Sequence, residues 1–386
     1  MSISPPPTVP PGSAARAGVT IRRATAADSE ARCELFARVT MDADLSLAVD
    51  RGPDFDALYR LQTGDYACWV GEEAGLLRGM GTVLARDGYV DGQPAKVGYL
   101  GDLRIEPGYQ GLGLLPRFYE RTLADAVAAT GARVFLTVVI ASNRQAIAAL
   151  TGPKAAARGI PPYTLLRRFS IRAVHATVPR RTRRTGYTVR RATAADLPAV
   201  EAFLDTDGRS RPYGYRFQAG ELTRRLAAWP GLDVSRFLLA FDRGGDLAGC
   251  TAVWDASGVK RTVVRAYRGR MRAVRAAYNT AGAMLRFPRL PAAGGVLRYA
   301  YLTHVAVPSR DPAVMAALLD VAYAEERRSG RVFLSACVWD DDPLAAAYRG
   351  FVTTDLPTNL YAVTLPGDPL PRVRGDDPPG FEMALV

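Results

Sequence analysis

The sequence predicts a mixed α/β sheet fold of the α+β class that is built twice along one chain. The 386 residues exceed the size of one ordinary domain and suit two, and the apolar share of 48 % is enough for a core in each. The third observation is an internal repeat. VTIRRATAAD at 19–28 returns as YTVRRATAAD at 187–196, at an offset of 168 residues.

Three further segments recur in the same order. They are the strand–turn–strand patterns at 68–81 and 238–251, GYLGDLRI at 98–105 with AYLTHVAV at 300–307, and ARVFLT at 132–137 with GRVFLS at 330–335. Each has the alternation or the short apolar run that is typical of a strand. Four matched segments in one order indicate a duplicated domain.

Each copy opens with a short strand and a helix start. Thr25 is followed three positions later by Asp28, and Thr193 by Asp196, which is the spacing of a capping box. The patterns of the first copy then predict three strands, a helix, a strand, a second helix and a last strand within 165–174. We expect the early strands to be antiparallel and the later strand–helix–strand unit to be parallel and right-handed.

Shifts in composition divide the chain into segments. We expect a disordered N-terminal lead at 1–17, a first domain at 18–175, a basic linker at 176–185, a second domain at 186–365 with an Arg-rich insert at 259–295, and a C-terminal tail at 366–386.

Composition also excludes several classes of protein. No apolar run is long enough to cross a bilayer and no signal peptide is visible, so we expect a cytoplasmic protein with no membrane partner. The four cysteines form no CxxC pair and the two histidines lie far apart, so we expect no metal site and inert, buried thiols. The net charge of +12 attracts anions in general.

A glycine-rich loop joins the strand at 99–105 to a helix. It reads EPGYQGLGLLPRF and includes Gly111 and Gly113. Such a loop binds anions, because glycine lets the backbone approach closely while free N–H groups and the helix dipole favour negative charge. The loop lacks the GxxxxGK[ST] signature, and Pro116 stands where the third glycine of GxGxxG belongs.

The segment QGLGLL at 110–115 resembles the acetyl-CoA signature [QR]-x-x-G-x-[GA] of the GNAT superfamily of N-acetyltransferases. YLGDLRIEP before it is similar to the strand that precedes the signature, and VFLTVV with Asn143 is similar to the segment that follows. The order of predicted elements is also that of the family. The resemblance covers nearly all of 18–175 and, more weakly, 186–365.

The resemblance implies an acyl-CoA-dependent N-acyltransferase, with acetyl-CoA as co-substrate and an amine on a small molecule or protein as acceptor. In this family the loop amides hold the pyrophosphate, the preceding strand holds the acyl and pantetheine part, and the asparagine contacts pantetheine. The matching positions are Leu103, Ile105, Gln110, Gly111, Gly113, Leu114 and Asn143.

Asp102 is the candidate general base, because it lies beside the implied thioester position and can take the ammonium proton directly or through a water. The alternative is a structural carboxylate that caps a turn or pairs with an arginine such as Arg104. Glu106 and Glu73 are weaker candidates.

Two departures from the family pattern concern the leaving group and the loop. The family's tyrosine acid, seven residues after the asparagine, is replaced by Leu150, so Tyr163 is the candidate acid. The alternatives to Tyr163 are that the protein has no general acid or that solvent supplies the proton. Leu115 stands in place of a small residue, which is expected to crowd the corner between loop and helix.

The second copy is expected to be degenerate. Where the loop belongs it reads PSRDPAVMAALL, which has no glycine, and Asp311 adds negative charge there. His304 aligns with Asp102, but a lone histidine on an apolar strand is more often a packed core residue. The acyl-CoA site is therefore expected in the first copy alone.

The insert is expected to carry most of its charge on one helix. The arginines concerned are Arg261, Arg265, Arg268, Arg270, Arg272 and Arg275. We expect a solvated helix that packs its valine, methionine and tyrosine face on the domain. Contact with an acidic substrate, CoA phosphates or nucleic acid is the alternative, and nucleic acid is disfavoured because no aromatic stacking platforms are interleaved.

Three functions follow. The favoured one is an N-acyltransferase whose second copy shapes the acceptor site. The others are an inactive acyl-CoA-binding or regulatory protein, and last a basic nucleic-acid-associated protein. The acceptor, the acyl length and the oligomeric state stay open; a basic protein disfavours polycationic acceptors unless local acids reverse this, and the candidates are Asp42, Asp44, Asp54 and Asp56.

Overall fold

The computed structural model describes residues 18–38, 44–371 and 377–386, so the predicted disordered lead and Asp42 lie outside it. The elements of the first copy are β1 (Thr20–Arg23), α1 (Ser29–Arg38), β2 (Leu45–Asp50), α2 (Ala57–Gln62), β3 (Tyr66–Glu73), β4 (Leu76–Val90), β5 (Gln93–Ile105), α3 (Leu114–Thr130), β6 (Val134–Ile140), α4 (Arg144–Leu150), α5 (Pro153–Ala156) and β7 (Tyr163–His175).

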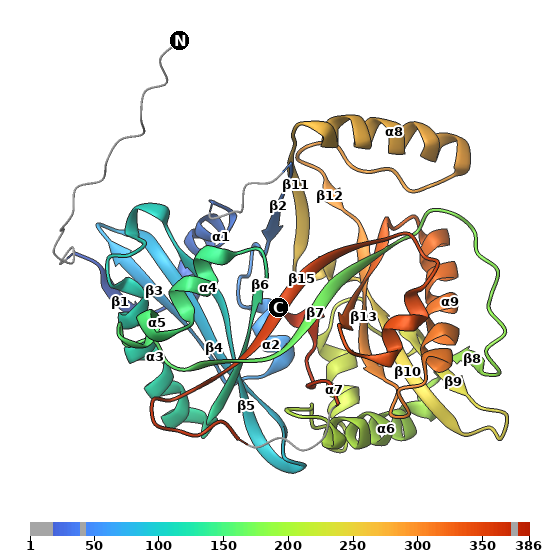
Figure 1. The fold of residues 1–386 in the computed structure, drawn as a ribbon, viewed down its shortest axis with the longest axis horizontal. Helices are drawn as coiled ribbons and strands as arrows, with labels where there is room; N and C mark the ends of the chain where they lie inside the picture. The colour runs from blue at the N-terminus through green and yellow to red at the C-terminus, as the bar shows by residue number, and fades with distance from the viewer. Residues whose placement is uncertain (1–17, 39–43, 372–376) are drawn as a thin grey trace.

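The second copy repeats the order of the strands of the large sheet and adds an insert, but it has no counterpart of β2, α4 or α5 (Figure 1). Its elements are β8 (Thr188–Arg191), α6 (Leu197–Ser210), α7 (Glu221–Ala228), β9 (Phe237–Phe241), β10 (Leu247–Trp254), β11 (Arg261–Tyr267), α8 (Arg270–Leu285), β12 (Val296–Leu297), β13 (Tyr299–Ala306), α9 (Pro312–Ser329), β14 (Phe333–Trp339) and β15 (Thr353–Thr364). β11, α8 and β12 are the insert.

Both predicted capping boxes form. Thr25 and Asp28 cap each other's backbone at the start of the first copy, and Thr193 and Asp196 do the same in the second. The sequence prediction missed β2 and α2. The six residues of α2 are too few for a clear helical period, and β2 pairs with β11 of the second copy, a partner that local pattern does not reveal.

One twelve-stranded sheet spans both copies, in the order β1-β3-β4-β5-β6-β15-β7-β14-β13-β10-β9-β8. The early strands of each copy pair antiparallel, and β5 with β6 and β13 with β14 are parallel, as predicted. Figure 1 shows β15 and β7 side by side in the centre. The sheet is thus mixed, with an approximate two-fold relation between β15 and β7.

The two copies exchange their last strands. β15 of the second copy pairs with β6 of the first, from Thr358 opposite Ile140 to Thr364 opposite Val134. β7 of the first copy pairs with β14 of the second, from Phe169 opposite Trp339 to His175 opposite Phe333. Neither copy therefore completes its sheet without the other. The boundary between 18–175 and 186–365 stays a prediction about the sequence, and it does not cut the sheet into two closed units.

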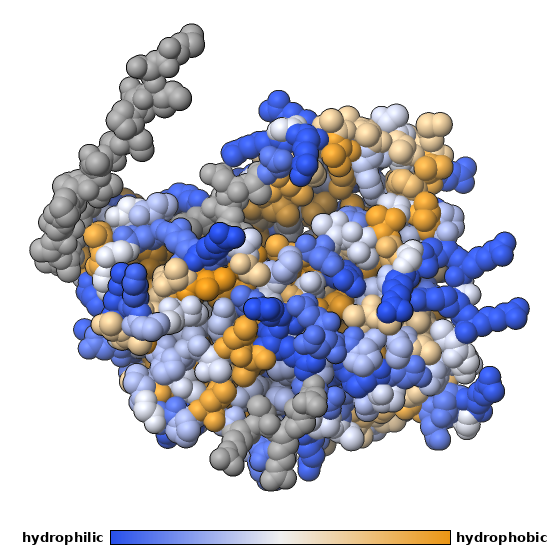
Figure 2. Space-filling model, viewed as in Figure 1, coloured by the Kyte–Doolittle hydropathy of each residue, from blue (hydrophilic) through white to orange (hydrophobic). Residues whose placement is uncertain are grey.

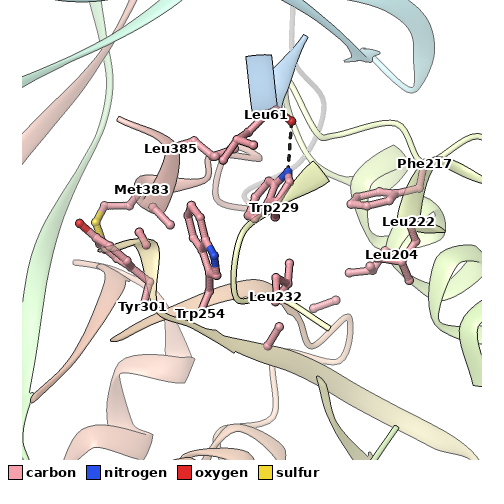
Figure 3. Packing of buried hydrophobic residues seen from close by; sticks show 14 of the residues in the cluster. Leu61, Leu204, Phe217, Leu222, Trp229, Leu232, Trp254, Tyr301, Met383 and Leu385 are labelled. Atoms are coloured by element: carbon pink, nitrogen blue, oxygen red, sulfur yellow. Dashed lines mark hydrogen bonds between the residues drawn. The ribbon is translucent and has the colours of Figure 1, made fainter. Parts of the chain in front are cut away.

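The hydrophobic core, like the sheet, contains residues of both copies. On one face of the second half, α6 and α7 cover the sheet, and this core continues to Leu58 and Leu61 on α2 of the first half. Residues Met383–Leu385 of the tail lie within it and are almost fully buried. Figure 3 shows the indole N–H of Trp229 donating to the backbone oxygen of Leu61, a contact between the halves with a donor–acceptor distance of 3.1 Å. One apolar core thus holds the two copies together.

The connection between the copies is anchored. No helix or strand lies between His175 and Thr188, as expected of a linker. Its Arg183 donates to the carboxylate of Asp320 on α9, at 2.7 Å for the closest pair, and to the backbone oxygens of Ala316 and Ala347. The Asp320 side chain is only 3 % exposed, so this arginine neutralises a buried carboxylate.

The insert departs from its prediction. Arg261 and Arg265 lie on strand β11, so the six arginines do not share one helix. Helix α8 projects from the body in Figure 1, and Val274 and Met284 are 47 % and 82 % exposed. The expected packing of a valine and methionine face is therefore wrong for these two residues. Figure 2 shows polar and apolar side chains mixed on this projection.

Candidate functional site

A β-bulge places Asp102 at the centre of the first half. Met80 of β4 pairs with Arg104 of β5 and Thr82 pairs with Gly101, so Gly81 opposes two residues instead of one. Asp102 has φ +52, in the left-handed region that non-glycine residues seldom adopt. Such strain in a strand is typical of a functional position.

The Asp102 carboxylate lies in a charged network on the α1/α2 face of the sheet. Arg51 donates to it at 3.1 Å, and the Tyr59 hydroxyl donates a second, short hydrogen bond. The Thr82 hydroxyl donates to Tyr59 at 2.9 Å. Burial alone would raise the pKa of Asp102, but the Arg51 charge and the Tyr59 hydrogen bond outweigh burial and lower that pKa. Asp102 is therefore a carboxylate at neutral pH.

The pairing expected for Asp102 is made by a different arginine. Arg104, the partner considered from the sequence, donates to the backbone oxygen of Leu103 at 2.9 Å instead. Arg51 was missed because it follows β2, which the sequence pattern did not reveal. Its side chain is 2 % exposed, and it lies over the rings of Phe55 and Tyr59.

Strands β5 and β6 stop pairing before they reach Asp102. β5 and β6 are joined at Gly98–Phe135 and Tyr99–Leu136 only, and the ladder stops before the bulge. On its other side β6 pairs with β15 along its whole length, Val134–Ile140. Backbone groups of Leu103 and Ile105 thus lie on a strand that has parted from β6, which is where the resemblance expects the acyl and pantetheine part.

The glycine loop lies at the start of α3. Gly111 and Gly113 have φ +77 and +75, and a Cβ on either would meet open space. Gly113 is the N-cap of α3 and offers no side-chain cap. In the described chain, no backbone acceptor is recorded for the N–H groups of 111–115. Free amides on a seventeen-residue helix make this end suited to an anion.

Side chains brace this loop. The Gln110 amide donates to the Ile105 backbone oxygen at 3.1 Å and accepts from Gln145 at 2.6 Å. The Asn143 side chain caps α4 by accepting from the Ala146 N–H at 3.0 Å. Gln110 and Asn143 are thus brought to one side of the loop, where both already have protein partners.

The two leucines after the loop pack inward. Leu114 is 3 % exposed and packs with Phe118, whereas Leu115 joins Val139 and Leu150. The leucine that was expected to crowd the corner thus lies in an apolar cluster.

Tyr163 begins β7 on the α3 side of the sheet. Its hydroxyl forms a short hydrogen bond with that of Tyr119 on α3, and its ring packs edge-on against Tyr361 of β15. Burial raises the pKa of Tyr119 to about 12 and raises that of Tyr163 well above its ordinary value. Both phenols therefore keep their protons at neutral pH, as a general acid must.

The weaker base candidates have other partners. Glu106 binds Arg78 at 2.9 Å and Arg38 at 3.3 Å. Glu73 accepts a short hydrogen bond from Tyr109. Neither has a recorded contact with the Asp102 network.

The second half has the same bulge with different chemistry. Cys250 pairs with Ala306 and Ala252 with Thr303, and His304 has φ +51. The imidazole bonds Thr303 at 3.0 Å and packs 5.1 Å from the Trp229 ring. Burial and the Arg225 charge lower its pKa well below the ordinary value, so His304 is a neutral core residue.

The anion-binding features are absent from the corresponding loop. The Asp311 carboxylate caps α9 by accepting from the Ala313 N–H at 2.8 Å, so the protein fills that helix end with its own anion. Arg310, with φ +54, pairs closely with Asp342. Both line a cavity of about 100 Å³ that also includes His304 and Tyr348. The second copy thus caps its helix end with its own carboxylate, whereas Gly113 offers α3 of the first copy no side-chain cap.

Lys260 of the second half lies within electrostatic range of Arg51 and Asp102 of the first half. It precedes β11, is 7 % exposed, and donates to the backbone oxygen of Val386 at 2.6 Å. Burial, reinforced by the Arg51 charge and opposed by Asp102, lowers its pKa to about 7. No motif in the sequence marked this residue, because its surroundings come from both copies.

Among the described residues, no group of three His, Cys, Asp or Glu side chains could hold a metal ion. No helix in the described ranges is long and apolar enough to span a membrane. The four cysteines are free, and Cys33 and Cys337 are partly exposed. Burial raises the pKa of all four thiols, which keeps them protonated.

Comparison with known proteins identifies a domain within the chain. A model of the acetyltransferase (GNAT) family matches residues 34–151, which hold the bulge, the loop and α3. The chain contains a GNAT acetyltransferase domain. This domain makes the protein an acyl-CoA-dependent N-acyltransferase by class. No curated protein matches.

Solved structures extend the GNAT fold over both copies. A GCN5-related N-acetyltransferase from Sphaerobacter thermophilus matches with a TM-score of 0.58 at 16 % identity, over 91 % of this chain and 98 % of that one. N-myristoyltransferase of Saccharomyces cerevisiae with bound myristoyl-CoA matches with a TM-score of 0.60 at 11 % identity, over 94 % and 85 %. At such identities the likeness concerns the fold alone.

Proposed function

We propose that this GNAT protein transfers a short acyl group, acetyl in the first instance, from coenzyme A to an amine, and that the reaction takes place in the first half. The observation that carries the proposal is that two features occur together. The N-terminus of α3 follows a glycine and has no side-chain cap, and the bulge in β5, the strand before that loop, holds a carboxylate on a strained backbone. The second half keeps the bulge but has neither feature.

The family resemblance, supported by the geometry, assigns the following roles within this proposal. Amides of Gly111, Gly113 and Leu114 face the pyrophosphate, and Gln110 and Asn143 hold the loop and α4 in place beside it. Backbone groups of Leu103 and Ile105 run along the pantetheine and acyl part. The acceptor amine attacks the thioester carbon, the C–S bond breaks, and the thiolate departs.

Proton transfer is divided between the two faces of the sheet. Asp102, ionised and held by Arg51 and Tyr59, receives the ammonium proton on the α1/α2 face, directly or through a water. Tyr163, protonated and on the α3 side, gives a proton to the departing thiolate. Amine deprotonation and thiolate protonation thus occur on opposite faces. The cytoplasm remains the predicted location.

The test is calorimetric titration of acetyl-CoA into wild type, Gly113→Trp and Gly131→Trp. Gly131 is the matched control, because it caps the other end of α3 with φ +72 and also faces open space. We expect one-site binding by wild type and by Gly131→Trp, with affinity for Gly113→Trp reduced at least about 100-fold, since a bulky side chain fills the anion site. No binding by wild type would refute the proposal.

A non-catalytic acyl-CoA-binding role is the second candidate. Its support is the low pKa of Asp102, which makes this carboxylate a weak proton acceptor, together with Leu150 in the family's tyrosine position. Acetyl-CoA binding without release of free CoA in an amine screen would favour it.

A further inference from the structure

Three arginines pack on the α1/α2 face of the first half, and each lies over an aromatic ring. Arg32 and Arg51 lie 5.1 and 4.7 Å from the Phe55 ring, and Arg104 lies 4.4 Å from the Phe36 ring. Arg32 has the Asp56 carboxylate at 2.6 Å, and Arg51 has that of Asp102 at 3.1 Å.

Arg104 has no such anion. Its one recorded hydrogen bond within 18–38, 44–371 and 377–386 goes to the Leu103 backbone oxygen, and no carboxylate of those ranges forms an ion pair with it. Its Nε is buried without a partner, and burial lowers its pKa despite the charge of Asp102. A half-buried guanidinium without an anion is costly unless a ligand supplies one.

The position of Arg104 points to the acceptor as that ligand. Arg104 pairs across the ladder with Met80, in the cluster that contains Phe36, so its side chain lies on the same face as the Asp102 network. The phosphate-binding end of α3 belongs to the other face, where Leu114 packs with Phe118. The phosphates of CoA are therefore not the anion that would bind Arg104.

Nearby acidic residues do not favour a polycation. Asp54 pairs with Arg60, Asp56 with Arg32, and Asp44 lies 3.8 Å from Arg270. These described carboxylates are neutralised by the protein itself. The second half offers a contrast, because Ala306 occupies the position of Arg104 after its bulge.

We propose that Arg104 binds a carboxylate of the acceptor, which makes the acceptor an α-amino acid, whose amine and carboxylate are attached to one carbon. This inference rests on the proposed function. Two extended residues span at most about 7 Å, and Asp102 and Arg104 are two positions apart across a bulge, so an amine at Asp102 and a carboxylate at Arg104 fit a short acceptor. A guanidinium can hold that carboxylate through two parallel hydrogen bonds.

The test measures release of free CoA from acetyl-CoA with each amino acid and with its amide, which lacks the carboxylate. Wild type is expected to prefer the best free amino acid by at least about 100-fold in kcat/KM. Arg104→Met should abolish this preference, chiefly through KM, while Arg104→Lys retains part of it. Arg38→Met is the control, since Arg38 is half-exposed and already paired with Glu106; it should keep the preference.

Several results would overturn the inference. Equal rates with acids and amides, or a preference that Arg104→Met leaves intact, would do so. So would a preference for succinyl-CoA over acetyl-CoA that Arg104→Met removes, because Arg104 would then bind the acyl group. Acetyl-CoA binding with no acylated amino acid or amide overturns this inference alone, whereas absence of acetyl-CoA binding refutes the proposed function. Thermal unfolding of each variant shows that it is folded.

Discussion

Asp102 in the first half and His304 in the second occupy the same bulge with nearly the same φ, yet their surroundings are opposite. Asp102 is an ionised carboxylate on the strand that leads into an open glycine loop. His304 is a neutral ring among aromatic residues, beside a helix end filled by Asp311. The strained backbone thus belongs to the shared fold, whereas the chemistry depends on side chains that only one copy has.

The largest expected effect separates the two bulges directly. Asp102→Asn should reduce kcat/KM by about 10²–10⁴-fold, because it removes the base while keeping a similar shape. His304→Asn should leave the rate per folded molecule unchanged. Steady-state release of CoA measures both, and a rate that survives Asp102→Asn would assign Asp102 a structural role.

The next prediction concerns the stability of the Asp102 network. Arg51→Met should lower the free energy of unfolding by about 3–5 kcal/mol, since Asp102 would remain a buried, unpaired charge. Arg51→Met/Asp102→Asn should recover much of this loss. Arg225→Met in the second half should cost less, because its partner Glu221 keeps a second ion pair with Arg224 at 2.7 Å. Urea denaturation compares the three variants, and equal losses at Arg51 and Arg225 would contradict the asymmetry.

Tyr163 in the first half and Tyr348 in the second half give a smaller contrast. Tyr163→Phe should lower kcat by about 100-fold if its proton reaches the thiolate. Tyr348→Phe, in the cavity of the second half, should not change kcat. Single-turnover kinetics with the best acceptor measures the rate of acyl transfer in both variants. An unaffected Tyr163→Phe variant would leave thiolate protonation to solvent.

A pH-dependent prediction concerns Lys260, a residue of the second half whose pKa is lowered in part by the charge of Arg51 in the first half. Its pKa is about 7 in the folded chain, against an ordinary value of 10.5. Between these values the unfolded chain binds the extra proton, so stability rises with pH by up to about 1.4 kcal/mol per unit. Below about pH 7 Lys260 is protonated in both the folded and the unfolded chain, and the folded chain bears the full cost of burying the charged ammonium.

Chemical denaturation from pH 6 to 10 compares wild type with Lys260→Met. The wild type should gain stability relative to the variant as the pH rises. Parallel curves would mean that Lys260 titrates normally.

The sequence predicted the elements whose patterns are local. Alternation gave β3, β4 and β5, and the Thr25/Asp28 and Thr193/Asp196 spacings gave both capping boxes. It did not predict β2 or the pairing of β15 with β6, because those partners lie far away in the chain. Arg51 and Lys260 were missed for the same reason, since each acquires its role from neighbours that the fold brings together.

The sequence by itself determined the duplication, the glycine loop and its absence from the second copy, because these are properties of residue types at fixed spacings. The tertiary structure decided which arginine neutralises Asp102, that the copies exchange strands, and that Arg104 has no anion among the described residues. Pairing, burial and the resulting pKa values depend on distances between residues up to hundreds of positions apart, and only the packed chain sets those distances.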